Sequence, residues 1–134
     1  MLLAGCTSAT GPDAELPADT DYPLAMTSLT SPVAPEQSVQ VRLENNGPTR
    51  LGFNLCTDGD LERSVGGGWV VLSHQPYPCA LVLSALDPGG RVTLHYSIPS
   101  DAPEGTYRLR IRFLSMAFGG MSIIRRSDSF LVRD

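Results

Sequence analysis

The clearest pattern in the chain is a strict alternation of apolar and basic side chains between residues 107 and 113. The apolar positions are Tyr107, Leu109, Ile111 and Phe113, and arginines occupy positions 108, 110 and 112. A period of two places every apolar side chain on one face of a β-strand. A helix would instead spread the arginines around its circumference and bury some of them without partners, at a cost of several kcal/mol. The segment is therefore predicted to be a half-buried strand.

Similar patterns predict antiparallel strands elsewhere in the chain. Residues 39–44 and 92–98 alternate between apolar and polar side chains,. Another strand is predicted over 51–55, after an Asn-Asn-Gly-Pro turn at 45–48,. Shorter apolar runs complete the set, at 24–29, 69–72 and 130–132. About seven short strands separated by turn signals indicate two packed antiparallel sheets. The predicted fold class is thus an all-β antiparallel sandwich, formed by residues 22–134.

The apolar positions change parity at the end of the clearest strand. After Phe113 they fall at Leu114, Met116 and Phe118. Such a slip predicts a β-bulge near Phe113 and Leu114.

Two stretches are candidate interaction surfaces. Met116, Phe118 and Met121 flank a Gly-Gly turn and cannot all face the core if the parity slips, and exposed Met and Phe often mark a contact site,. The alternative is that a bulge folds them over the open end of the sandwich. Tyr77 lies in a proline-stiffened segment, 74–78, and is the fourth candidate.

The N-terminus resembles the end of a bacterial lipoprotein signal peptide. Residues 3–6 read Leu-Ala-Gly-Cys, the order of a lipobox, in which a diacylglycerol on Cys6 would anchor the protein to a membrane,. Residues 1–5 are interpreted as the remnant of the signal peptide, because the usual basic and apolar regions are missing. Residues 7–21 are small, polar and acidic, and together with Cys6 they predict a disordered tether over 6–21,. The alternative is a free cysteine in an ordinary tail.

The charge and apolar content exclude two classes of function. Ten basic residues stand against 14 acidic ones, a net charge of -4, so no basic surface for nucleic acid is expected,. No apolar run reaches the roughly 18 residues that a transmembrane helix needs. Any membrane attachment is therefore predicted to be through the lipid.

Four short motifs in order make the resemblance to a known family specific. They are Asn-Asn-Gly at 45–47, Gly-Gly-Trp-Val at 67–70, Leu-Asp-Pro-Gly-Gly at 86–90 and Pro-Glu-Gly-Thr-Tyr-Arg-Leu at 103–109. This order resembles the bacterial Ig-like domains of envelope lipoproteins. The resemblance implies an immunoglobulin-like sandwich and an envelope location, and it implies no reaction. It also implies that Trp69 and Tyr107 are structural core residues, with the tyrosine bonding to backbone at a corner of the sandwich.

Two cysteines, Cys56 and Cys79, remain once Cys6 is assigned to lipidation. In an exported protein they are expected to form a disulfide, and the family that the chain resembles often carries such a pair. A metal site built from these cysteines, His74 and one acid is the competing interpretation, but the paired spacing of a zinc site is missing. Segment 58–62 resembles the start of a calcium loop without its later ligands, so a solvated turn is expected there,.

No catalytic motif occurs in the sequence. The sequence has no Gly-x-Ser-x-Gly, no His-Glu-x-x-His and no cysteine nucleophile with a free histidine,. The predicted function is a non-catalytic envelope lipoprotein that presents an Ig-like domain to a protein or envelope partner, without metal, cofactor or small-molecule substrate. The alternative is a protease inhibitor of similar fold that presents the loop 75–78 to an enzyme.

Overall fold

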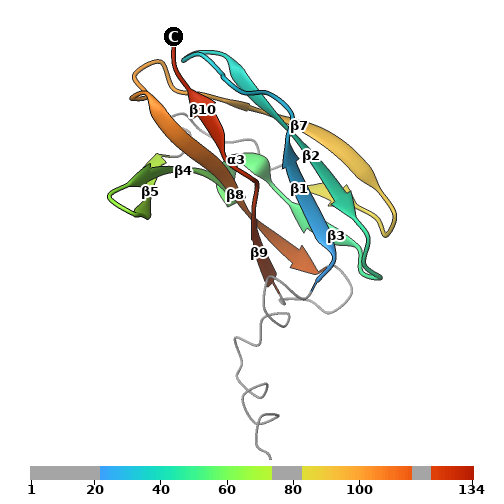
Figure 1. Cartoon of the computed structure of the whole chain (residues 1–134). Helices are drawn as coiled ribbons and strands as arrows, with labels where there is room; N and C mark the ends of the chain where they lie inside the picture. Colours follow the sequence, from blue (N-terminus) through green and yellow to red (C-terminus); the bar gives the residue numbers. More distant parts are fainter. Residues whose placement is uncertain (1–21, 74–82, 116–121) are drawn as a thin grey trace, which may run out of the picture.

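The computed structural model describes residues 22–73, 83–115 and 122–134, and these form two β-sheets packed face to face (Figure 1). The smaller sheet has three strands in the order β1-β2-β7, and the larger has seven strands arranged around β8. Every pairing between named strands is antiparallel. The expected all-β, immunoglobulin-like antiparallel sandwich is therefore confirmed.

The smaller sheet consists of β1 (Leu24–Ser28), β2 (Ser38–Asn45) and β7 (Arg91–Ser97). The apolar side chains at positions 39, 41 and 43 of β2 are fully buried, as their alternation predicts,. On β7 burial changes along the strand: Val92 is 38% exposed whereas Tyr96 is 3% exposed. The large sheet thus covers only one end of β7.

The larger sheet is organised by β8 (Gly105–Ser115), which pairs along both of its edges. Its neighbours on one edge are β4 (Gly59–Val65) and β3 (Leu51–Phe53), and on the other β9 (Ser122–Arg126) and β10 (Phe130–Val132). The sheet continues outward through β5 (Gly68–Ser73) beside β4, and through β6 (Ser84–Leu86) beside β3.

A single helical turn, α3 (Leu55–Asp58), separates β3 from β4 along the edge of β8. Gly52 lies opposite Leu114 and Gly59 opposite Ile111, so the chain advances seven residues while β8 advances three. The four extra residues form the helical turn, which Asn54 caps by accepting a hydrogen bond from the N–H of Cys56,. The prediction of a strand over residues 51–55 is therefore wrong at its last two residues, because β3 ends at Phe53.

The core lies between the inner face of β8 and the smaller sheet. The inward side chains of β8, the fully buried set predicted from the alternation, are Tyr107, Leu109, Ile111 and Phe113. Phe113 meets Phe53 edge to face, with ring centroids 5.3 Å apart,. The alternation continues to Ser115, which is 2% exposed, while Leu114 stays on the outer face. The predicted bulge near residues 113 and 114 is therefore wrong.

Tyr107 occupies the structural position that the family resemblance implied. Its ring is fully buried and stacks on Phe130, with 6.3 Å between centroids. Its hydroxyl donates a hydrogen bond of 2.6 Å to the carbonyl of Pro103, four residues upstream. Burial raises the pKa of this phenol above its ordinary value, and Asp101 adds to the effect whereas Arg63 opposes it,.

A buried polar cluster connects the start of the described chain to the turn after β2. The Tyr22 hydroxyl lies 3.0 Å from Asn45 Oδ1 and accepts a hydrogen bond of 3.0 Å from the Thr49 N–H. The Asn45 side chain donates to the carbonyls of Thr49 and Leu86 at 2.8 and 3.0 Å. Gly47 packs directly on the tyrosine, because a Cβ at position 47 would lie 2.3 Å from Cζ of the ring. The Asn-Asn-Gly turn is thus held by side-chain hydrogen bonds as well as by backbone conformation.

Candidate interaction surface

Most of the site residues predicted from the sequence lie outside the described residues. These are Cys6, Tyr77, Cys79, Met116, Phe118 and Met121. Lipidation, the disulfide and the Met–Phe patch therefore stay predictions. Cys56, the other half of the predicted disulfide, lies in α3 and is half-buried.

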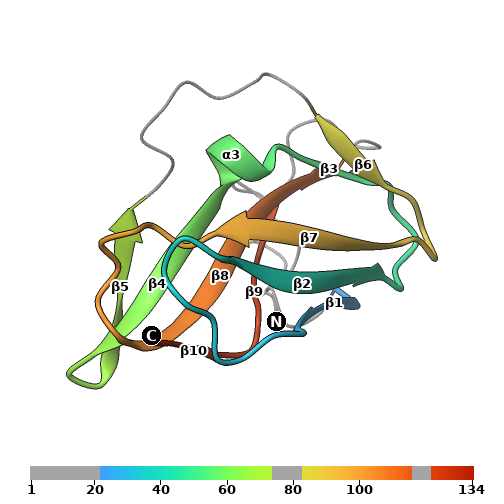
Figure 2. The same ribbon diagram turned by 90° about the horizontal axis from the view of Figure 1, so that it is seen from above.

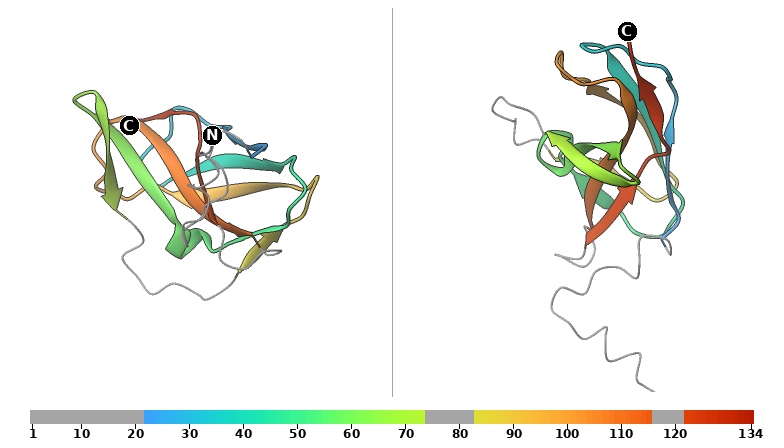
Figure 3. Two further views of the ribbon diagram at one scale, coloured as in Figure 1. Left: turned by 90° about the horizontal axis from the view of Figure 1, so that it is seen from below. Right: turned by 60° about the vertical axis from the view of Figure 1, so that its left-hand side comes forward.

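The most distinctive surface feature is the hairpin formed by β4 and β5. Gly66 and Gly67 join the two strands with φ of 58° and 86°, and Val65 lies opposite Gly68. Positive φ at both central residues is the mark of a type I′ turn, whose twist matches that of the flanking strands, and glycine adopts it without strain. Figure 2 places β5 at one side of the large sheet, and Figure 3 shows the hairpin projecting beyond the strands of the smaller sheet.

Exposed apolar side chains gather on this hairpin. Eight large apolar side chains are exposed in the described parts of the chain, and four of them belong to β4 or β5. They are Val65 (47% exposed), Trp69 (37%), Val70 (53%) and Val71 (44%). The expectation that Trp69 is a core residue is therefore wrong. Trp69 pairs with Ser64 of β4 and faces the outer side of the large sheet, away from the smaller sheet, so no second layer covers it.

The backbone of β5 is paired on one side only. No strand of residues 22–73, 83–115 or 122–134 pairs with its other side. In a two-residue hairpin the residues that close the turn exchange hydrogen bonds, and pairs farther along alternate between bonded and non-bonded. Counting from the closing pair at Val65 and Gly68, the N–H and C=O groups of Trp69 and Val71 point away from β4.

The outer face of the sheet beside the hairpin carries a cluster of charges around Glu62. This carboxylate is 5% exposed and accepts a hydrogen bond of 2.6 Å from Nε of Arg108. Two further guanidinium groups approach it, Arg126 at 3.4 Å and Arg110 at 3.7 Å. Arg110 also lies 3.8 Å from Asp60. The expectation of a solvated turn over residues 58–62 is therefore wrong, because most of that segment is the inner part of β4.

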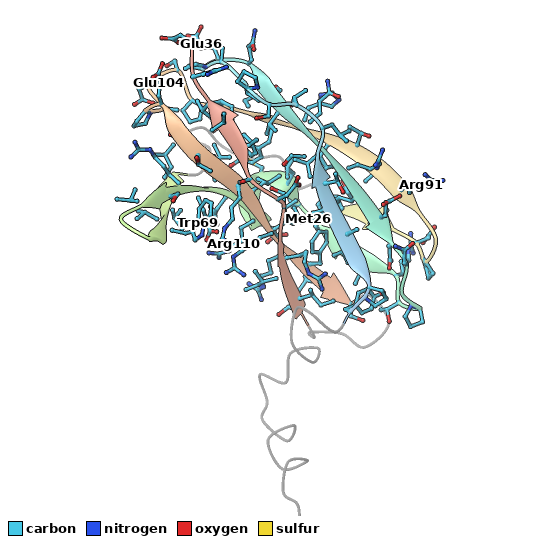
Figure 4. The ribbon with its side chains drawn as sticks, viewed as in Figure 1. Met26, Glu36, Trp69, Arg91, Glu104 and Arg110 are labelled. Carbon is cyan, nitrogen blue, oxygen red and sulfur yellow. The ribbon has the colours of Figure 1, made fainter. Side chains whose placement is uncertain are left out.

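Arginines outnumber carboxylates on this face. The arginines at 108, 110, 112 and 126 share it with Asp60 and Glu62, as the strand registers require. Arg108 extends across β4, and its Cζ lies 4.0 Å from the centroid of the Trp69 ring, a cation–π contact,. Figure 4 shows the labelled Trp69 and Arg110 on the same side of the ribbon. The excess of positive charge therefore reaches the edge strand itself.

The described residues hold no group of three or more His, Cys, Asp or Glu side chains that could bind a metal ion. Among the helices that the structure describes, none has the length and apolar character to cross a membrane. What the hairpin offers chemically is a row of backbone donors and acceptors, an apolar surface on both sides of that row and guanidinium groups beside it.

The sequence contained a signal for this hairpin. Two glycines between runs of strand-forming residues are a short-range hairpin pattern, and Gly66 and Gly67 stand between Leu61–Val65 and Trp69–Leu72,. The strand before the turn gives no clear strand signal, because Asp60 and Glu62 within it, and Asp58 just before it, give the segment the composition of a loop.

Comparison with known proteins assigns this chain to no family. No protein-family model and no curated protein sequence matches the chain. Among solved structures, the ASH/PapD-like domain of human CEP192 (PapD-like domain 7) is similar with a TM-score of 0.45 and 14% sequence identity. The alignment covers 93% of this chain and 92% of that one.

Proposed function

We propose that this protein is a non-catalytic interaction module, presented at a bacterial cell envelope by a lipid on Cys6. One observation carries the proposal: the edge strand β5, with sequence Gly-Trp-Val-Val-Leu-Ser, has no charged residue and exposes apolar side chains on both faces. The partner would be another protein, and no nucleic acid, cofactor or small-molecule substrate is part of the proposal.

Natural sheets usually protect their edges with charged side chains, proline, bulges or a covering loop, because an open edge pairs with other chains. The hairpin has a register shift between Leu61 and Glu62, but Gly68–Val71 lies beyond it and pairs regularly with β4. A strand that is apolar on both faces has the composition of an inner strand covered on both sides. An edge of this kind is therefore suited to receive a partner.

The envelope location rests on the lipobox at residues 3–6 and on the polar segment 7–21, which would act as a tether,. A domain held on such a tether would present the hairpin to proteins of the same compartment. Catalysis is not part of the proposal, because the sequence has none of the nucleophile, acid–base or metal motifs sought in it.

A photocrosslinking experiment tests the interaction. The full chain is expressed in its native host with p-benzoylphenylalanine in place of Val70, and in a matched control in place of Thr93, which is exposed on β7 of the other sheet. A discrete adduct of one partner protein at position 70, absent at position 93, supports the proposal. Absence of any adduct at position 70, or the same adducts at both positions, refutes it.

A second experiment tests lipidation of Cys6 and the location at the cell envelope. Intact mass of the membrane fraction, measured after the gene is expressed with its upstream codons, is expected to show a diacylglycerol-sized increment at Cys6. The Cys6→Ser variant is expected to leave the membrane fraction. If the wild-type protein carries no lipid and distributes between the fractions as Cys6→Ser does, the envelope location is refuted. The crosslinking experiment then still tests the interaction surface.

A further inference from the structure

We infer that the free edge of β5 binds an extended, acidic segment of a partner protein, which adds to the large sheet as one more strand. Adding a strand to an exposed edge is a general mode of peptide recognition, in which backbone hydrogen bonds give affinity and side chains give specificity. This inference rests on the proposed interaction function and specifies the chemistry of the partner.

The backbone of β5 supplies the hydrogen bonds for such a strand. Trp69 and Val71 direct their N–H and C=O groups outward, so four groups are available along the edge,. They are two residues apart, a spacing of about 6.8 Å, which is the repeat of an extended chain. A partner strand in register can therefore satisfy all four.

Apolar surface on both sides of the edge would pack against the side chains of the incoming strand. Trp69 and Val71 face the outer side of the sheet, and Val65 and Val70 face the opposite side, as their partners on β4 and β8 require. Because all four are at least one third exposed, an added strand would remove apolar area from water on both faces,.

The charges select an acidic strand. Glu62 is buried and already bonded, which leaves the guanidinium groups as the more exposed charges of the outer face. Arg108 places its guanidinium over Trp69, and neighbouring strands lie about 4.8 Å apart, so carboxylates on the outer face of an added strand would lie beside it,. The local positive excess is opposite in sign to the net charge of -4 of the whole chain. A basic segment would be repelled at the same place.

A second copy of this chain fits less well. Two copies paired edge to edge about a twofold axis would merge their outer faces, which brings the two arginine clusters to the same side of one continuous sheet. Pairing over the six residues of β5 would also bury far less area than the roughly 1,200 Å² of a stable dimer interface,. An acidic partner supplies the charge that a second copy lacks.

Binding of short peptides to the full chain tests the inference. The probe is acetyl-Ser-Glu-Val-Glu-Val-Glu-Ser-amide, and the controls replace each Glu with Ser or with Lys. Trp69 is the single tryptophan, so its fluorescence reports binding at the edge, and amide chemical shifts locate it at residues 69 and 71. We expect the Glu peptide to bind at least about ten-fold more tightly than the Lys peptide, and to lose affinity as salt rises.

Two variants at one position separate backbone pairing from mere surface contact. Val71→Pro removes an outward N–H and leaves the bonds to β4 intact, whereas Val71→Thr keeps the N–H and the branched shape,. Affinity for the Glu peptide should fall at least about ten-fold in V71P and stay within about three-fold in V71T. If V71P does not fold, the same test uses the wild-type protein and a Glu peptide whose backbone amides are N-methylated. This peptide cannot donate backbone hydrogen bonds, so it is also expected to lose binding.

Equal binding of the Glu and Lys peptides, or equal binding to V71P and V71T, would overturn the inference. The inference would also be overturned, in favour of a second copy of the chain, by one combination of results: the wild type sediments as a dimer, V71P sediments as a monomer, and no peptide binds. If the peptides fail while the crosslink at Val70 persists, the interaction function stands and the acidic strand is wrong.

Discussion

Replacing Glu62 by glutamine tests whether the buried carboxylate organises the outer face of the sheet. Glu62 is 5% exposed and bonds to Arg108 at 2.6 Å, with Arg126 and Arg110 within 3.7 Å. Glutamine keeps the shape and one acceptor oxygen but removes the charge that balances three guanidinium groups. Removing one partner of a fully buried pair costs about 3–5 kcal/mol, and these arginines are partly exposed, so water compensates part of the loss.

The expected cost of E62Q is therefore about 2 kcal/mol in the free energy of unfolding, or roughly an 8 °C fall in Tm. Urea unfolding followed by Trp69 fluorescence measures it, and Asp60→Asn is the matched control. Asp60 lies 3.8 Å from Arg110 with a side chain that is 21% exposed, so D60N should cost less than about 1 kcal/mol,. A double-mutant cycle of E62Q with Arg108→Gln should give a coupling of about 1 kcal/mol or more. A cost for E62Q below about 0.5 kcal/mol, or one equal to that of D60N, would refute this reasoning.

Three further predictions concern the corner, the turn and the cysteines. Tyr107→Phe should cost about 1 kcal/mol below pH 10. Because its pKa is raised in the folded state, the unfolded chain loses the proton first, and stability of the wild type should fall above about pH 10 while Y107F lacks this fall in urea titrations,. Gly47→Ala should lower the free energy of unfolding by about 2 kcal/mol, because the new Cβ would clash with the buried ring of Tyr22; a neutral effect would contradict that packing,. Intact mass should show Cys56 and Cys79 joined in the exported protein, two hydrogens lighter than after reduction; two thiols open to alkylation without reductant would exclude the disulfide.

The parts of the fold that the sequence predicts well are those in which local alternation and burial agree. The strand at Tyr107–Phe113 is central in the sheet and covered on one face only, so its period of two is strict. The strand at residues 39–44 is similar. The corner role of Tyr107 also follows from a local motif, since its hydroxyl reaches only four residues back.

The parts that the sequence misses depend on distant partners. Asp60 and Glu62 resemble loop residues until arginines of β8, more than forty positions away, neutralise them in an inner strand. Trp69 has the composition of a core residue, but its register with β4 puts it on the outer face of the large sheet, away from the smaller sheet. No local signal distinguishes a buried Ser115 from a parity slip, because the alternation there continues through a polar side chain. The candidate interaction surface, which combines an edge with a cluster of charges, is non-local in the same way.

The central place of β8 also determines when this domain can fold during synthesis. Both edges of β8 are paired, to strands that begin at Leu51 and end at Val132, so the large sheet has no centre until residue 115 has been made. The smaller sheet and the β4–β5 hairpin can pair earlier, but their apolar faces then have nothing to pack against. The growing chain therefore stays without a core over most of its length, and the domain should form in one late step once β8 joins the strands already made.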